Sequence, residues 1–132
     1  MQTSVPYIEE RARYLGDHPH YRAPVDVCLE VSGDGLRVTL IRPNGDRLLF
    51  SVSKQDIQSV DYLAEQLGLE QAEIEENILI GPDEWLTRHA VRVRVTDPED
   101  VFPNGLVHRF AFESEYSARV FHKRARVALN LR

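Results

Sequence analysis

A chain of 132 residues has the usual length of one domain and can bury a core without disulfide bonds. Its one cysteine, Cys28, excludes a disulfide bond within the chain. With 42% hydrophobic and 28% charged residues, the composition excludes a disordered chain, and the net charge of −5 argues against a nucleic-acid partner. Residues 1–10 show no secretory signal, and no apolar run is long enough for a transmembrane segment. We therefore expect one cytoplasmic domain spanning residues 1–132.

A regular alternation of apolar and polar residues predicts three consecutive strands between residues 25 and 53. The sequences Gly33-Asp34-Gly35 and Pro43-Asn44-Gly45-Asp46 divide them, and both favour tight turns because glycine and asparagine tolerate positive φ angles. Strands joined by two short turns form an antiparallel meander. The side chains expected to point inward from the third strand are those of Leu48, Phe50 and Val52.

The middle of the chain, residues 54–84, has a mixed pattern. We expect a short strand or turn near Ile57, helical turns within residues 59–77 interrupted at Gly68, and an apolar run at residues 78–80 that Gly81-Pro82 ends. Residues 61–84 contain eight acidic and no basic side chains, whereas residues 85–132 contain nine basic and five acidic ones. The two segments are expected to pair with each other or to form separate solvated faces.

The last third predicts two strands and a helix. Residues 90–96 and 106–112 alternate as strands do, and the prolines and acids of residues 97–105 indicate an exposed loop between them. Ser114 is a suitable N-cap for a helix over residues 115–131. The side chains expected on its core-facing side are those of Ala118, Phe121, Ala125, Ala128 and Leu129.

Three short segments and the order of the predicted elements resemble bacterial pleckstrin-homology-like (PH-like) domains. The segments are residues 14–19 (Tyr-Leu-Gly-Asp-His-Pro), which would open a first strand, residues 56–60 (Asp-Ile-Gln-Ser-Val) and residues 77–82 (Asn-Ile-Leu-Ile-Gly-Pro). The resemblance implies a mostly β fold, an antiparallel barrel or sandwich closed by a C-terminal amphipathic helix. PH-like folds bind lipids, peptides or partner proteins, or only assemble, so the fold does not specify the function.

A cluster of arginines is the candidate binding site. Arg88, Arg92 and Arg94 share one face of a strand, and Arg109 points outward from the next strand; a hairpin turn near residue 101 would place Arg94 opposite Arg109. Like charges directly across a strand pair are destabilising. We therefore expect a carboxylate from residues 65–84, a bound anion such as a lipid headgroup, or solvent to offset them.

The remaining reactive residues predict no catalytic or metal site. His18 and His20 lack the further ligands that zinc needs, and Cys28 has no neighbouring base to activate it. Trp85 is expected in the core or at its rim, with a partner anchor as the alternative. No cofactor is expected. The sequence favours a non-catalytic binding or assembly module that acts through a sheet face or the C-terminal helix, with anionic lipid or small-anion binding as the alternative.

The predicted C-terminal helix has a second apolar edge, formed by Val120, Val127 and Leu131 beside the core-facing side. An exposed apolar edge of this kind usually marks an interface, and a two-fold dimer is the commonest way to cover one. We expect these three residues to contribute to a homodimer contact. The competing explanation is that the barrel mouth or the segment 5–8 covers the edge within one chain.

Overall fold

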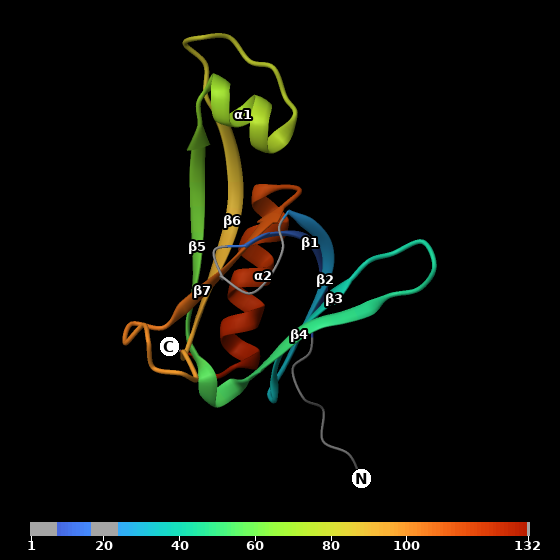
Figure 1. Cartoon of the computed structure of the whole chain (residues 1–132), viewed down its shortest axis with the longest axis vertical. Helices are drawn as coiled ribbons and strands as arrows, with labels where there is room; N and C mark the ends of the chain where they lie inside the picture. The colour runs from blue at the N-terminus through green and yellow to red at the C-terminus, as the bar shows by residue number, and fades with distance from the viewer. Residues whose placement is uncertain (1–7, 17–23, 132) are drawn as a thin grey trace.

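The computed structural model describes residues 8–16 and 24–131, and the statements below concern these residues. Seven strands, two α-helices and one 3₁₀ turn make up the fold (Figure 1). In chain order they are β1 (Ile8–Gly16), β2 (Val25–Ser32), β3 (Gly35–Leu40), β4 (Arg47–Ser53), η1 (Lys54–Asp56), β5 (Ile57–Leu67), α1 (Leu69–Glu76), β6 (Leu86–Val95), β7 (Leu106–Phe112) and α2 (Glu115–Ala128).

All seven strands form one antiparallel sheet in the order β4-β3-β2-β1-β7-β6-β5. The first strand, β1, lies at the centre, where it pairs with β2 on one side and with β7 on the other. The edge strands β4 and β5 do not pair with each other in the described part of the chain, so the sheet is open. The expected mostly β fold with a C-terminal helix is confirmed, but the closed barrel is wrong.

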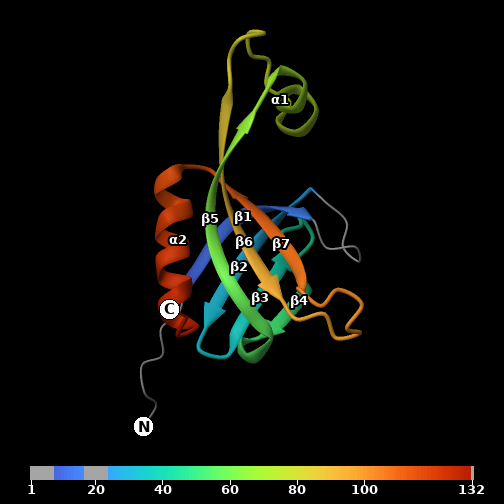
Figure 2. The same cartoon turned by 90° about the vertical axis from the view of Figure 1, so that its left-hand side faces the viewer.

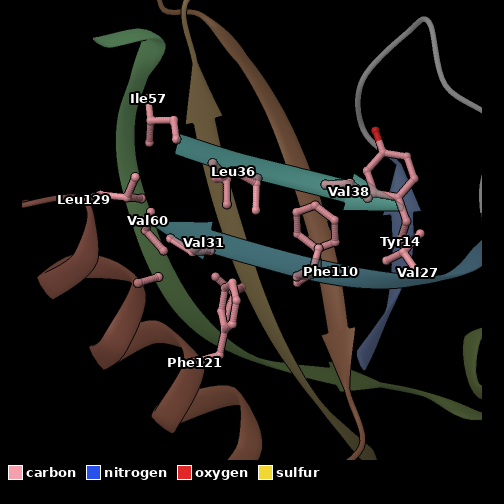
Figure 3. Close-up of a cluster of buried hydrophobic side chains, with 14 of the residues drawn as sticks. Tyr14, Val27, Val31, Leu36, Val38, Ile57, Val60, Phe110, Phe121 and Leu129 are labelled. Atoms are coloured by element: carbon pink, nitrogen blue, oxygen red, sulfur yellow. The ribbon is translucent and has the colours of Figure 1, made fainter. Parts of the chain in front are cut away.

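The curved sheet and α2 enclose a single hydrophobic core (Figures 2 and 3). Tyr14, Val27 and Phe110 from the sheet are fully buried, and Phe121 from α2 lies 5.1 Å from Phe112, measured between ring centroids. The helix begins as predicted, since the Ser114 hydroxyl oxygen accepts a hydrogen bond from the backbone N–H of Ser117. All five residues expected on its core-facing side are buried. The helix ends at Ala128, three residues earlier than expected.

Most predicted strands are present, with local corrections. The meander is confirmed as β2, β3 and β4, but a register shift in the β3–β4 pairing places Leu48 opposite Thr39 and leaves Leu48 48% exposed. Residues 14–16 close the first strand instead of opening it. The rest of that motif, residues 17–19, lies outside the described residues, as do His18 and His20.

The largest correction concerns residues 59–67, which were expected to be helical and instead belong to the long strand β5. This strand pairs with β6 from Ile57, opposite Val95, to Leu67, opposite Leu86. The hydrogen bonds of that ladder outweigh the weak helical preference of Glu, Gln, Ala and Leu. Within residues 59–77, helical structure is confined to α1, and the apolar run at residues 78–80 forms no strand.

Candidate functional site

The hairpin of β5 and β6 extends beyond the rest of the sheet (Figures 1 and 2). The last pair between β6 and β7 is His89 opposite Phe112, and β5 and β6 continue from Glu65 opposite Arg88 to Leu67 opposite Leu86. The chain between them contains α1. We call residues 65–88 the arm, and the remaining described residues the body.

Backbone geometry gives α1 a defined end on this arm. Asn77 adopts a left-handed conformation (φ 55°), and its N–H donates to the carbonyl of Glu73 at 3.1 Å. The bond from Asn77 to Glu73 is that of a left-handed (αL) helix cap, and the N–H of Ile78 donates in addition to the carbonyl of Ala72, also at 3.1 Å. Ala72 is the only buried side chain of this short helix. Apolar burial therefore contributes little to fixing α1 on the sheet.

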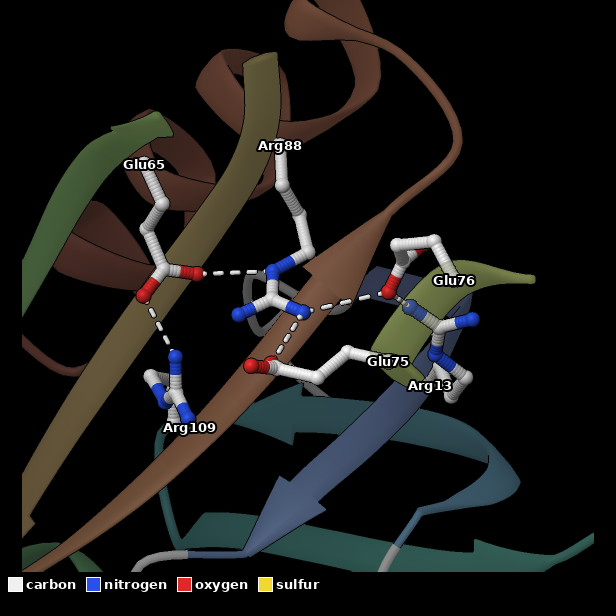
Figure 4. A network of polar contacts seen from close by, with 6 residues as sticks. All are labelled: Arg13, Glu65, Glu75, Glu76, Arg88 and Arg109. Carbon is white, nitrogen blue, oxygen red and sulfur yellow. Dashed lines mark hydrogen bonds and ion pairs between the residues drawn. The ribbon is translucent and has the colours of Figure 1, made fainter. Parts of the chain in front are cut away.

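Charged side chains hold α1 in place instead (Figure 4). Arg88, only 6% exposed, lies between β5 and α1. Its Nε donates to Glu65 Oε1 at 2.9 Å, and its Nη1 donates to Glu75 Oε1 at 3.0 Å and to Glu76 Oε2 at 3.1 Å. One guanidinium thus connects a strand of the arm to two consecutive carboxylates of its helix.

Two arginines of the body extend this network. Arg13 of β1 donates to Glu76, and Arg109 of β7 donates to Glu65. The network contains three arginines and three glutamates, so its charges balance. It joins the arm to two strands of the body.

The electrostatic environment keeps Arg88 charged despite its burial. Burial disfavours the charged guanidinium, but the hydrogen bonds and charge of Glu65, with the hydrogen bonds of Glu75 and Glu76, outweigh it, and the pKa of Arg88 lies above its ordinary value. Buried ion pairs add little net stability relative to apolar contacts, but removing one partner is costly because it leaves an uncompensated charge. The network therefore fixes one arrangement of the arm more than it stabilises the fold.

The structure corrects the register predicted for the arginine cluster. Arg92, not Arg94, lies opposite Arg109, while Arg94 pairs with Val107 and its Nη1 donates to the carbonyl oxygen of Asn104 at 2.9 Å. The cross-strand partner of Arg109 therefore differs by two residues from the predicted one, which corresponds to a turn centred one residue earlier in the chain. The expected carboxylate is present, because Glu65 contacts both Arg88 and Arg109. Anion binding by Arg88, Arg92, Arg94 and Arg109 stays a prediction.

A pocket of about 470 Å³ lies where the arm meets the body. Its lining has three arginines and three acids, together with apolar side chains. The charged members are Arg11, Arg13, Arg88, Asp26, Glu76 and Glu113. This balance shows no preference for an anion. The described lining holds no serine or cysteine, and Nδ1 of its histidine, His89, lies 2.8 Å from the hydroxyl of Tyr62.

The arm also carries large apolar side chains in contact with solvent. Ile74, Leu79 and Trp85 are 74%, 77% and 67% exposed, and Leu69 and Ile78 are also exposed. The expectation that Trp85 lies in the core or at its rim is wrong. Sequence reasoning missed this surface, although the run at residues 78–80 before Gly81-Pro82 was the available signal; it resembled a buried strand.

The edge of α2 expected to form a dimer is only partly exposed. Val127 is 64% exposed, Val120 is half-buried, and Leu131 is half-buried and packs against the core. The alternative was that the segment 5–8 covers this edge, and residues 5–7 of that segment lie outside the described residues. A homodimer contact through these residues stays a prediction.

Cys28 is half-buried on the outer face of β2. Its burial, together with the negative charges of Glu9 and Glu30, raises the pKa of the thiol above its ordinary value. A raised pKa disfavours the thiolate, which is the nucleophilic form.

Comparison with known proteins gives no family, since no family model matches this sequence and no curated protein matches it significantly. Among the described residues, no group of three or more His, Cys, Asp or Glu side chains could hold a metal ion. No helix in this part of the chain is long and apolar enough to cross a membrane.

Proposed function

We propose that this chain is a non-catalytic, PH-like protein-binding module that contacts its partner through the arm. The observation that carries the proposal is the exposure of Ile74, Leu79 and Trp85 on an ordered projection. Exposed apolar clusters on soluble domains usually mark interaction sites, and tryptophan is enriched among the residues that dominate binding energy. A projection fixed by ion pairs presents these side chains with little loss of conformational entropy on binding.

The PH-like assignment has support from the order of the elements. Seven antiparallel strands are followed by one C-terminal helix that packs against the sheet. The edge strands β4 and β5 do not pair in the described part of the chain, so the sheet differs from the closed barrel that the resemblance implies. The assignment suits a binding role because PH-like folds serve mainly as recognition and assembly modules.

The charges of the outer sheet face favour a protein partner over an anionic ligand. Carboxylates already contact Arg88 and Arg109, and Asp61 lies opposite Arg92 on β5. An added phosphate or lipid headgroup would have to compete with these carboxylates. The pocket where the arm meets the body offers the same balance of charges.

Site-specific photo-crosslinking in the producing cell tests the proposal. A benzophenone side chain is placed at Leu79, at Ile74, or at the control position Arg42, which is exposed in the β3–β4 connection. We expect a discrete protein adduct from both arm positions and none from Arg42. Equal labelling at all three positions, or no adduct from the arm, would contradict the proposal.

Liposome co-sedimentation distinguishes the anionic-lipid alternative. Vesicles of phosphatidylcholine that contain phosphatidylserine would be compared with vesicles of phosphatidylcholine alone. We expect no binding to either. Binding to the anionic vesicles that is lost in Arg92→Gln would favour the alternative instead.

A further inference from the structure

The outer side of α2 has an exposed stripe with both apolar and basic residues. Tyr116, Val120, Lys123 and Val127 are spaced by four, three and four residues, so they lie along one side of the helix. Tyr116 is 78% and Val127 64% exposed, Lys123 is exposed, and Val120 is half-buried. This side points away from the core that Ala118, Phe121 and Ala125 contact.

The arm and α2 carry opposite charge. The helix α2 has four basic side chains and one acidic one, whereas residues 65–88 have seven acidic side chains and one basic one. Three of the seven acids, Glu65, Glu75 and Glu76, belong to the ion-pair network. The other four, which are exposed, are Glu70, Glu73, Asp83 and Glu84.

The two surfaces do not meet within one chain. In Figure 2, α1 and α2 lie on opposite sides of the β5–β6 hairpin. The arm's paired acids contact Arg13, Arg88 and Arg109, which belong to strands, and α2 packs on the inner side of the sheet. The predicted pairing of the acidic middle with the basic last third is therefore found within the sheet and the arm. On α2, Arg119 pairs with Glu115 and lies over the Tyr62 ring, whereas Lys123, Arg124 and Arg126 have no acidic partner among the described residues.

We propose that the arm of one copy docks on the α2 stripe of a second copy. This inference rests on the proposed function of the arm and names its partner. Ile74, Leu79 and Trp85 would cover Tyr116 and Val127 of the second copy, and the exposed acids of the arm would surround Lys123 and its basic neighbours. Apolar contacts at the centre with complementary charges at the rim are typical of specific interfaces.

In the two-fold dimer that we propose, each chain supplies one arm and one α2, so the dimer contains two identical arm–α2 contacts. In this dimer, residue Leu79 of each chain contacts the other chain's α2. The arrangement differs from a dimer in which the two α2 helices face each other, because it joins two different surfaces. That difference permits a decisive experiment with mixed variants.

The test uses light scattering and fluorescence energy transfer between terminally labelled chains over a range of concentrations. We expect Leu79→Asp and Val127→Asp each to weaken dimerisation at least about tenfold, since each variant loses both contacts. A mixture of the two variants keeps one complete contact, between the intact arm of one chain and the intact α2 of the other. Heterodimers should therefore form in the mixture at concentrations where each variant alone is monomeric.

Controls separate this contact from other effects. Leu48→Asp changes an exposed side chain on β4, which lies at the opposite edge of the sheet from β5, and this variant should dimerise like the wild type. Circular dichroism verifies that each variant is folded. If Val127→Asp unfolds, Tyr116→Asp replaces it, because Tyr116 is the more exposed member of the same stripe. Added salt should weaken the wild-type dimer, since the rim is charged.

Three outcomes would overturn the inference. These are a wild type that stays monomeric at several hundred micromolar, a Leu79→Asp variant that dimerises normally, and a mixture that forms no heterodimer. None of them decides the proposed function, because crosslinking from Leu79 and Ile74 to a different protein would still support a binding arm.

Discussion

Apolar and charged side chains are distributed in opposite ways in the body and in the arm. In the body, Tyr14, Phe110 and Phe121 are at most 2% exposed, whereas on the arm Ile74 and Leu79 are at least 74% exposed. The interior of the arm is small: it holds the buried side chains of Leu67 and Ala72 beside that of Arg88, which contacts the carboxylates of Glu65, Glu75 and Glu76.

This contrast separates two physical roles. Apolar burial is the main favourable term in folding, and burying one large side chain contributes about 1.5–3 kcal/mol. A buried ion network adds little net stability but penalises every arrangement that leaves a charge unpaired. The body thus supplies the stability of the fold, and the arm uses charge to hold one shape while its apolar side chains stay available for binding.

The largest effect is expected from the body. Phe121→Ala removes a ring that is 2% exposed and packs against Phe112, so it should lower the free energy of unfolding by about 3–5 kcal/mol. The matched control on the same helix is Tyr116→Ala, which removes a 78% exposed ring and should change it by no more than about 0.5 kcal/mol. Urea denaturation measures both. Similar midpoints for the two variants would mean that α2 does not contribute to the core.

A smaller effect is expected at the outer face of the body. Because burial and the charges of Glu9 and Glu30 raise the pKa of Cys28, iodoacetamide at pH 8 should alkylate the folded chain several-fold more slowly than the urea-unfolded chain. The folded chain holds the thiol proton more tightly than the unfolded chain does, so the raised pKa contributes to stability at neutral pH. This contribution should decline as the pH rises above the unfolded thiol's pKa and disappear above the folded one. Equal alkylation rates in both states would contradict this account of Cys28.

The smallest effect on stability is expected from the apolar surface of the arm. Replacing both Ile74 and Leu79 by serine should leave the free energy of unfolding within about 0.5 kcal/mol of the wild type, since both side chains are already in water. The same variant should lose the proposed contact with α2 of a second copy. A loss of about 2 kcal/mol or more would show that these side chains belong to a packed core.

The sequence predicted the body well because its signals are local. Alternation in β2, β3 and β7, the turn residues between the meander strands, and Ser114 as an N-cap each act over a few neighbouring residues. The first strand was placed too late in the chain, since the resemblance implied that it opens at Tyr14, whereas β1 spans Ile8–Gly16. Its other residues, including Glu9, Glu10 and Arg11, show no clear apolar alternation.

The arm was hidden because distant residues determine it. Residues 59–67 form a strand only because β6 supplies the partner, and the paired residues are about 20 to 35 positions apart in the chain. Arg88 resembles an exposed strand arginine until α1 folds back and brings Glu75 and Glu76 to it. The predicted cross-strand partner of Arg109 was off by two residues, because the strand register depends on how the loop of residues 97–105 turns.

Hydrogen exchange of an Arg88→Met variant tests whether the ion-pair network holds α1 on the arm, and Arg92→Met on the same strand face is the control. Methionine keeps most of the apolar stem but removes the charge that Glu65, Glu75 and Glu76 share. We predict that the amides of α1 exchange at least about tenfold faster in Arg88→Met, while β2 and α2 keep wild-type protection and Arg92→Met changes neither. Unchanged protection of α1, or an equal loss of protection in arm and body, would contradict an arm that its ion-pair network holds independently of the core.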